Sequence, residues 1–415
     1  MQHSFWRRFG PWIAFLIAAT AYYPRFASKP GGIFLYSHAA SCLLHEQVLP
    51  QCDLRFTYPP AFALLMTPFV LLPPVGQLIV WYVISLACAV VCCELSTRIA
   101  LRFIPGSWTA RDIAWLRILG VLLSLKFILA VYETQSYDLL MLPAILLGVI
   151  ALMDENDVGA GAAFGIAAAL KVTPLLFLPY LIVRRRFLAA GVFVLVLGVV
   201  SISQDLILTP QGGAHSYLVT WLRDVAGASV FEHSAGSQLP FWDGVNIYNL
   251  SLRGALARLV DGTPYQPDFL IILRATQIAF IGLIGLLVLY AMRLEALVPV
   301  EVSLLIIAML MLSPMTSRTH FVNLMLPYYL LTAAWLKDAT TKRLGAAVLI
   351  LSFIGCTGIP RDLVPRSFTE FMRDHNDIML GALVLIVYLA VVIRFPQRWG
   401  IGSRSADSTA APAPQ

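Results

Sequence analysis

Two carboxylates in one loop can act as general bases. Glu46 and Asp53 are the only acidic residues between positions 25 and 74. A carboxylate held at a membrane surface can take a proton from the hydroxyl group of a substrate. We favour Asp53, because it lies near Arg55 and shortly before Tyr58-Pro59-Pro60, where the prolines restrict the backbone. Tyr58 is a candidate for substrate contact, and the alternative for both acids is that they are solvated loop charges.

A lysine stands inside an apolar stretch, where a charge is costly. Lys171 lies within residues 159–183 and is followed by Pro174. Its ammonium group can meet an anion such as a lipid phosphate, or its long side chain can reach the outer headgroups. We expect Arg318 and His320 to help bind the same phosphate, because arginine offers a planar fork of donors. Their alternative role is anchoring at the membrane surface.

Four polar residues have the spacing of one short helix that leads into a later apolar run. They are Asn249, Ser251, Arg253 and Arg258. We expect Asn249 and Arg253 to contact the substrate. The triplet Asn249-Leu250-Ser251 also matches a glycosylation sequon, but so short a motif often occurs by chance.

The cysteines divide into two groups. Cys42 and Cys52 share a polar loop, where an oxidising compartment would allow a disulfide; alternatively, both are small buried residues. The remaining four lie in apolar runs. No spacing of cysteine and histidine resembles a zinc motif, so we expect no metal.

The elements that hold these residues belong to a membrane protein. The chain has 415 residues, of which 59% are hydrophobic and 13% charged, with a mean hydropathy of +0.78. A soluble domain carries about 25% charged residues. The net charge of +6 does not indicate nucleic-acid binding, because the basic residues cluster in short loops between apolar runs.

Apolar runs of sufficient length predict about ten membrane spans. They cover residues 11–25, 76–103, 112–131, 136–152, 187–207, 269–292, 296–313, 319–336, 344–358 and 377–394. The first lacks a signal-peptide cleavage site, so we expect an uncleaved span. Residues 159–183 read instead as two short helices that meet at Lys171–Pro174, buried among other helices.

The distribution of Lys and Arg predicts that both termini lie in the cytoplasm. Three loops then lie outside, at residues 25–74, 209–268 and 359–376, and Lys171 points toward the outer half of the membrane. The first loop contains an amphipathic stretch, Gly32–His45, and an apolar stretch, Pro60–Leu72, and we expect both to form helices that lie along the membrane surface. The tail, residues 396–415, is rich in Ala, Pro and Ser from Ser403 onward and is expected to be disordered.

Four segments in this order resemble glycosyltransferase family 87. They read FTYPPAFALLMTPFVLLPP (56–74), ALKVTPLLFLPYLIVRRR (169–186), NLSLRGALARL (249–259) and LSPMTSRTHFVNLMLP (312–327). The resemblance implies one all-α polytopic domain over residues 1–395, a GT-C-type bundle of about 10–12 transmembrane helices with interfacial helices in the first outer loop. It also implies a hexosyltransferase of the cytoplasmic membrane. The donor would be a polyprenyl-phosphate sugar, with mannose favoured, and the acceptor a glycolipid or glycan outside. Inverting transfer, without a nucleotide sugar, cofactor or tightly bound metal, is expected.

One position departs from the family pattern. Family members resemble one another in having an Asp near the start of the first outer loop, where this chain has Ile33. The base has then moved to another loop carboxylate, or the chain is a silent member. A further alternative is a transporter or lipid flippase that uses Lys171 and the broken helix to bind its substrate.

Overall fold

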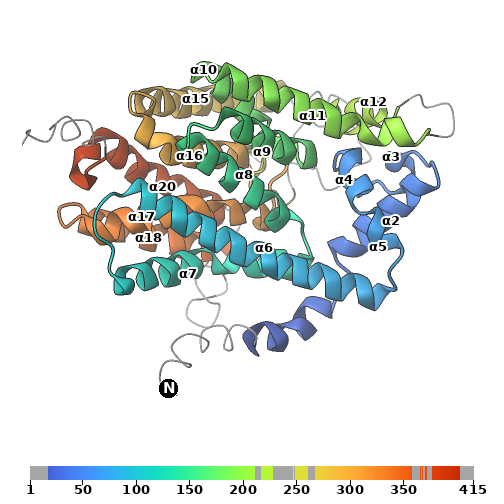
Figure 1. Ribbon diagram of the computed structural model, residues 1–415, viewed down its shortest axis with the longest axis horizontal. Helices are drawn as coiled ribbons and strands as arrows, with labels where there is room; N and C mark the ends of the chain where they lie inside the picture. The colour runs from blue at the N-terminus through green and yellow to red at the C-terminus, as the bar shows by residue number, and fades with distance from the viewer. Residues whose placement is uncertain are drawn as a thin grey trace, which may run out of the picture.

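The computed structural model is all-helical, with no strand in the residues it describes (Figure 1). These are residues 17–210, 216–227, 246, 248–259, 267–357, 365, 367, 370–371 and 376–401. The start of the first span, much of the loop 209–268, most of the loop 359–376 and the tail from residue 402 lie outside them. Residues 17–27 are helical, which agrees with the first expected span.

Six helices of the described chain are long and apolar enough to cross a membrane. They are α6 (Pro74–Phe103), α7 (Ala110–Thr134), α11 (Phe187–Ile207), α15 (Pro267–Ala291), α16 (Val298–Leu312, extended by the 3-10 turn Glu295–Leu297) and α20 (Asp377–Arg394). Each matches an apolar run of the sequence. The chain is therefore a polytopic membrane protein.

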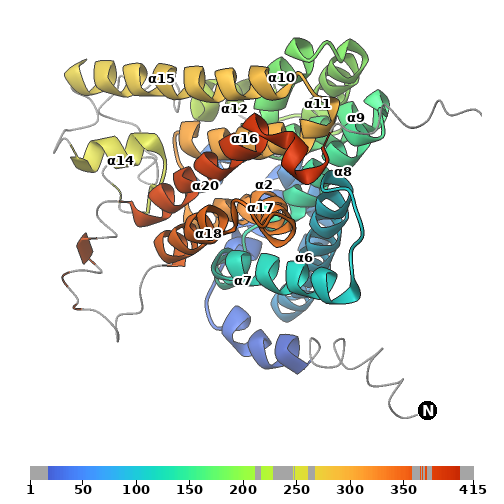
Figure 2. The ribbon, with the colours of Figure 1, turned by 90° about the vertical axis from the view of Figure 1, so that its left-hand side faces the viewer.

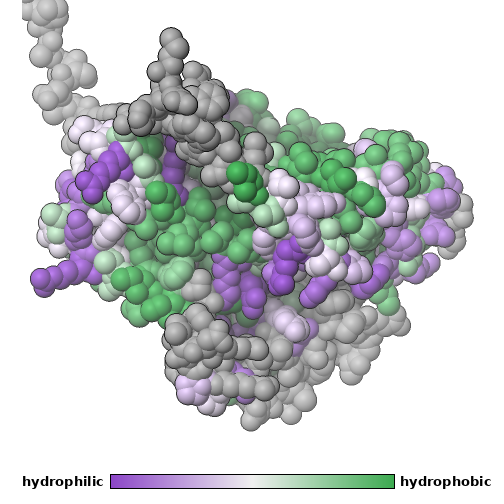
Figure 3. All heavy atoms as spheres, turned by 90° about the horizontal axis from the view of Figure 1, so that it is seen from below, coloured by the Kyte–Doolittle hydropathy of each residue, from purple (hydrophilic) through white to green (hydrophobic). Residues whose placement is uncertain are grey.

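Burial separates a central helix from peripheral ones. In α16, 83% of the apolar window is buried, whereas the corresponding shares in α11 and α15 are 22% and 17%. Apolar side chains on the peripheral helices face outward, and Figure 3 shows broad hydrophobic areas interrupted by hydrophilic clusters. Lipid is the solvent that such a surface requires.

Three expected spans form shorter helices. They are α8 (Asp138–Met153), α17 (Met325–Lys337, preceded by the 3-10 helix η5 at Arg318–Leu324) and α18 (Lys342–Thr357). The 16 residues of α8 reach about 24 Å, less than the roughly 30 Å of a hydrocarbon core. These three helices pack against neighbouring helices, so they need not span the hydrocarbon core alone. Figure 2 shows α17 and α18 beside α20.

The broken helix pair forms as the sequence predicts. Helix α9 (Asp157–Leu170) ends at Lys171, whose backbone is extended, and the 3-10 turn Thr173–Leu176 leads into α10 (Phe177–Val183). Pro174 lies in that turn, where a helical hydrogen bond from its nitrogen would be missing. Helix α9 packs along α11 through Gly161 and Gly165, because a Cβ at Gly161 would lie 2.3 Å from the carbonyl oxygen of Ala189.

A buried ion pair joins the broken pair to the central helix. The guanidinium of Arg184, just after α10, lies 3.3 Å from the carboxylate of Glu301 in α16, and both side chains are almost completely buried. The hydroxyl of Tyr180 donates to the same carboxylate at 2.8 Å. Arg184 also pairs with Glu295 at 2.7 Å. This network lies at the end of α10, away from Lys171.

Several short helices gather at one end of the bundle. Figure 1 shows α2 (Gly32–Leu44), α3 (Leu49–Cys52), α4 (Pro60–Leu65), α5 (Thr67–Val70) and α12 (Tyr217–Trp221) together there. The stretch Pro60–Leu72 is divided into two helices at Met66, and Thr67-Pro68 begins the second. The indole nitrogen of Trp221 donates to the carbonyl oxygen of Thr57 at 3.1 Å, which links α12 to the approach to α4.

Candidate functional site

A buried ion pair marks the break after α9. The ammonium nitrogen of Lys171 lies 2.6 Å from Oδ1 of Asp138, the first residue of α8. The Lys171 side chain is 11% exposed and that of Asp138 is not exposed at all. A charge at this depth is stable only with a partner, so the carboxylate fixes the lysine at the break.

The second oxygen of the same carboxylate is also occupied. The hydroxyls of Ser136 and Thr319 donate to Oδ2 of Asp138 at 2.6 and 2.8 Å. His320, next to Thr319, places its Nε2 3.9 Å from Oδ2 and keeps 18% of its side chain exposed. Asp138 thus binds Lys171, and His320 lies beside it, so two phosphate-binding candidates meet at one place.

The end of α7 positions this carboxylate. Gln135 ends the helix in the left-handed conformation, with φ of 54°, which turns the chain toward α8. Its side-chain amide donates to the carbonyl oxygens of Phe26 and Lys29, and its own carbonyl oxygen accepts from Trp81 at 3.0 Å. A Cβ at Gly32 would lie 2.7 Å from the backbone carbonyl oxygen of Gln135, so the close approach of α2 to this turn favours glycine there.

Aromatic rings form one wall beside the ion pair. The ring centroid of Tyr58 lies 4.7 Å from that of Tyr137 and 5.6 Å from that of Tyr36. The Lys171 ammonium lies 5.4 Å from the Tyr137 centroid, within range of a cation–π interaction. The structure thus brings Tyr58 to the neighbourhood of Lys171. Tyr36 lies on α2. Ile33, at the position where the family pattern has Asp, is completely buried in the first turn of that helix.

The two base candidates lie on either side of α3. Asp53 follows this helix and accepts two hydrogen bonds from the Arg55 guanidinium, at 3.0 and 2.7 Å. Glu46 follows α2 with a positive φ of 57°. Burial and then the Glu46 carboxylate raise the pKa of Tyr217 in α12 to about 12, which places Glu46 toward α12. Asp53 pairs with Arg55, whereas Lys171 pairs with Asp138.

Arg318 lies at the start of η5 with its side chain exposed. It is two residues from His320 and lies within electrostatic range of Lys126 and Asp377. The hydrogen bond from the backbone of Ser317 to His320 Nδ1 closes the first turn of η5. The structure therefore places Lys171 and His320 beside the same carboxylate, that of Asp138, whereas Arg318 is exposed at the start of η5.

The other two substrate-contact candidates are buried around α14 (Leu252–Leu259). Asn249 precedes this helix; its amide donates to the carbonyl oxygen of Pro314 at 3.0 Å, and its oxygen accepts from Ser251 and Thr316. Asn249 thereby links α14 to the loop before η5. Arg253 is buried in the first turn of α14.

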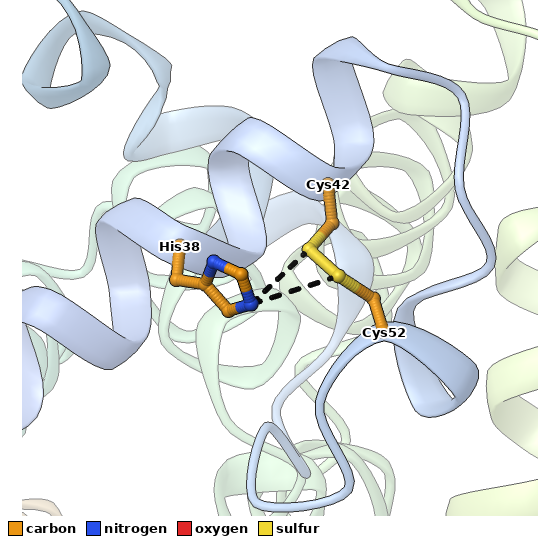
Figure 4. A group of neighbouring side chains, drawn as sticks. All are labelled: His38, Cys42 and Cys52. Atoms are coloured by element: carbon orange, nitrogen blue, oxygen red, sulfur yellow. Dashed lines mark hydrogen bonds between the residues drawn. A yellow bond between two sulfur atoms is a disulfide. The ribbon is translucent and has the colours of Figure 1, made fainter.

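A disulfide closes the first loop, as the sequence allows. Cys42 in α2 and Cys52 in α3 are joined, with 6.4 Å between their Cα atoms. Figure 4 shows the imidazole of His38 pointing at this bond, and its Nε2 lies 3.8 Å from each sulfur. The cross-link closes the segment from residue 42 to residue 52, which contains Glu46 and ends directly before Asp53.

Sequence reasoning missed Asp138. The residue begins an apolar run and reads as the polar start of a span. Its signal is charge balance: a buried lysine needs a buried carboxylate, and Asp138 is the acid within the expected span 136–152. Glu301, the partner of Arg184, was missed for the same reason.

Comparison with known proteins identifies the family. The model of glycosyltransferase family 87 matches residues 56–314, more than half of the chain. The matched segment includes Tyr58, Asp138 and Lys171. No curated protein and no solved structure matches the chain. The family match, over a polytopic helical bundle, shows that the chain belongs to glycosyltransferase family 87.

Proposed function

We propose that this membrane glycosyltransferase transfers a hexose, with mannose favoured, from a polyprenyl-phosphate-linked donor to a glycolipid or glycan acceptor. Family membership supplies the reaction class, sugar transfer. The lipid-linked donor is inferred from the membrane-embedded fold and from the resemblance described above. The bilayer holds both the enzyme and the donor, and transfer takes place on the outer face of the cytoplasmic membrane.

The observation that carries this proposal is the buried Lys171–Asp138 pair beside His320. It lies at a helix break, 11% exposed at the lysine, within a bundle whose surface is apolar. The phosphate of a membrane lipid is an anion that can reach a site within such a bundle. Ammonium has three N–H donors and Asp138 accepts from one of them, so the other two can face a phosphate.

Positive charge at the phosphate promotes the departure of the leaving group. As the acceptor hydroxyl attacks the anomeric carbon, the bond from that carbon to the phosphate oxygen breaks and negative charge grows on the phosphate. Lys171, fixed by Asp138, stabilises this charge in a site with little water. Attack from the opposite face inverts the anomeric carbon in a single displacement.

The base is proposed to be a first-loop carboxylate. Asp138 is less suited, because both of its oxygens accept hydrogen bonds and its side chain is not exposed. Asp53 remains favoured for its fixed position, with Glu46 as the alternative. Tyr58, Asn249 and Arg253 are proposed to shape the acceptor side; for Asn249 this means an indirect role, since it links α14 to the loop before η5.

A transporter or flippase is the rival function. The family match and the helices α2, α3, α4 and α12 at one end of the bundle favour transfer over transport, because transport requires no such layer. A silent member of the family is the second rival, since Ile33 replaces the expected acid. Both rivals lack transferase activity, so one assay separates them from the proposal.

The test is transfer of radiolabelled hexose from polyprenyl-phosphate hexose to membrane lipids by the purified protein in liposomes. Lys171→Met should abolish transfer or raise the donor KM at least tenfold. Lys171→Arg should keep part of the activity, since the charge survives in another shape.

Lys342→Met is the matched control. This lysine lies against the ring of Trp335, 5.7 Å from its centroid, and outside the proposed site. It should transfer at the wild-type rate. Full activity of folded Lys171→Met would overturn the phosphate-binding role, and absence of transfer by the wild type with every hexose donor tested would favour the rivals.

A further inference from the structure

Three potential metal ligands lie together in the first outer loop. His38 and Cys42 are one turn apart on α2, and Cys52 comes from α3 (Figure 4). The ligand atoms of all three lie within 4.8 Å of one another. None of them belongs to the Lys171 site. The sequence contains no zinc motif here, because the fold, and not local spacing, brings Cys52 to the other two.

The distances suit a small tetrahedral cation. Zinc binds thiolate at about 2.3 Å and imidazole at about 2.0–2.1 Å, so its bound sulfur and nitrogen atoms lie roughly 3.5 Å apart. His38 Nε2 is already 3.8 Å from each sulfur. Two sulfurs on one zinc ion lie about 3.8 Å apart. Once the disulfide is reduced, a small displacement of α3, which has only four residues, provides that separation.

The surroundings allow a metal to enter and complete its shell. His38 is exposed, whereas Cys42 is 3% exposed and so shields the site from one side. The amide oxygen of Gln47 lies 3.3 Å from the Cys52 sulfur, which adds an oxygen atom that can serve as a ligand at the cluster. Three protein ligands with an open fourth position form a recognised zinc arrangement.

We propose that reduction of the Cys42–Cys52 disulfide creates a binding site for Zn²⁺, held by His38, Cys42 and Cys52. A dithiol delivers two electrons and two protons, becomes a disulfide itself, and leaves two thiols on the chain. Zinc then displaces one proton from each thiol and accepts the neutral imidazole of His38. Exchange of the two zinc-bound thiolates with a disulfide re-forms the Cys42–Cys52 bond, converts that disulfide into two thiolates, and releases the metal.

The proposed zinc site lies next to both candidates for the catalytic base. Zinc binding itself is independent of whether the protein transfers sugar. Glu46 lies between the two cysteines, and Asp53 directly follows Cys52. Disulfide and zinc both tie α2 to α3, but they hold the sulfurs at different separations. The redox state of the loop would therefore set the position of both proposed base carboxylates.

The test measures metal binding by the full-length protein in detergent micelles. A phosphine reduces the disulfide with water, forming two thiols and the phosphine oxide, and it leaves no competing thiol in solution. Co²⁺ is then added as a spectroscopic probe, and bound Zn²⁺ is counted after gel filtration. The reduced wild type should bind one Zn²⁺ more than the Cys42→Ser/Cys52→Ser protein. With Co²⁺ it should show sulfur-to-cobalt charge-transfer bands. The oxidised wild type should bind no more Zn²⁺ than the double serine protein.

Histidine variants decide whether the site has three ligands. His38→Ala in the reduced protein should weaken zinc affinity at least tenfold. His45→Ala is the matched control, because this histidine bonds to the carbonyl oxygen of Ser41 at 2.7 Å and lies outside the cluster. It should bind as the wild type does. Zinc should also raise the Tm of the reduced wild type and not that of His38→Ala.

Three results would overturn the proposal. They are zinc binding by the reduced wild type no greater than by the double serine protein, equal binding by the oxidised protein, and undiminished binding by folded His38→Ala. The elution profile of each variant reports its folding, so a loss of binding is assigned only to protein that elutes as the wild type. Failure of zinc binding would leave sugar transfer untouched, because the transfer assay contains no added metal.

Discussion

Among single residues, the pairing of Asp53 with Arg55 makes the base hypothesis testable by pH. The side-chain hydrogen bond from Arg55 holds the pKa of Asp53 below its ordinary value of 3.8. If Asp53 is the base, it works only when ionised, so kcat/KM of the wild type should fall only below about pH 4. Arg55→Gln removes the guanidinium and keeps the backbone hydrogen bond from residue 55, so it should raise the pKa of Asp53 and move this acidic limb to higher pH.

Substitution of Asp53 and Glu46, one at a time, tests which of them is the base. Asp53→Asn should lower kcat by about 10²–10⁴-fold with donor binding unchanged, and Glu46→Gln much less. The reverse order would make Glu46 the base. If neither variant loses activity in an enzyme that transfers sugar, the base lies outside the first loop, and His320 is the next residue to substitute.

The sequence predicted one half of the buried pair and missed the other. Lys171 stood out because a charge inside an apolar run is costly. Asp138 did not, because a polar residue at the start of a run is common at helix ends. The contact between them joins residues 33 positions apart, and only the turn at Gln135 and the break after α9 bring them together. Such tertiary pairing leaves no local pattern.

At the level of helices, sequence patterns were more informative. Pro174 predicted the break, and apolar runs predicted α6, α7, α11, α15, α16 and α20 with small boundary errors. The sequence did not show which helices face lipid, since α16 and α11 are similarly apolar yet differ in burial, 83% against 22%. That difference depends on neighbours, which only the folded chain provides.

The close contact of α9 with α11 predicts a position-specific cost. Gly161→Ala places a methyl group 2.3 Å from the carbonyl oxygen of Ala189, so the backbones must separate. We expect a loss of about 1–3 kcal/mol, seen as a lower Tm in detergent. Gly198→Ala on α11, where a Cβ meets nothing within 4 Å, should leave the Tm unchanged or slightly raise it. Equal Tm values for the two variants would contradict this packing.

The pair between α10 and α16 predicts a larger effect. Arg184→Met leaves Glu301 buried without its cation, which should destabilise the protein by about 3–5 kcal/mol. Arg102→Met removes a pair with Asp154 that is 34% and 49% exposed, so its loss should cost only about 0–1 kcal/mol. Denaturation midpoints in the same detergent compare them; a stable Arg184→Met protein would show that the pair does not hold the two helices together.

On the scale of the whole molecule, orientation is the prediction with the widest consequence. The Lys171 and Arg184 ends of the broken pair carry separate charge networks. Single cysteines at residues 216–227 should react with an impermeant thiol reagent in intact cells, and single cysteines at Asp154–Asp157 only after permeabilisation. A cysteine-free background prevents labelling of the native thiols. Labelling of Asp154–Asp157 in intact cells would invert the orientation and place the site inside.

The pairing of Asp138 with Lys171 also constrains how the chain enters the bilayer during synthesis. Each charge presented alone to the membrane interior costs about 2.5–3.5 kcal/mol at mid-depth. Helix α8 is synthesised first and begins with Asp138, whereas Lys171 follows the last residue of α9. The two segments, joined by a short turn at residues 154–156, therefore enter most favourably as one helical hairpin, in which the charges neutralise each other before either meets lipid.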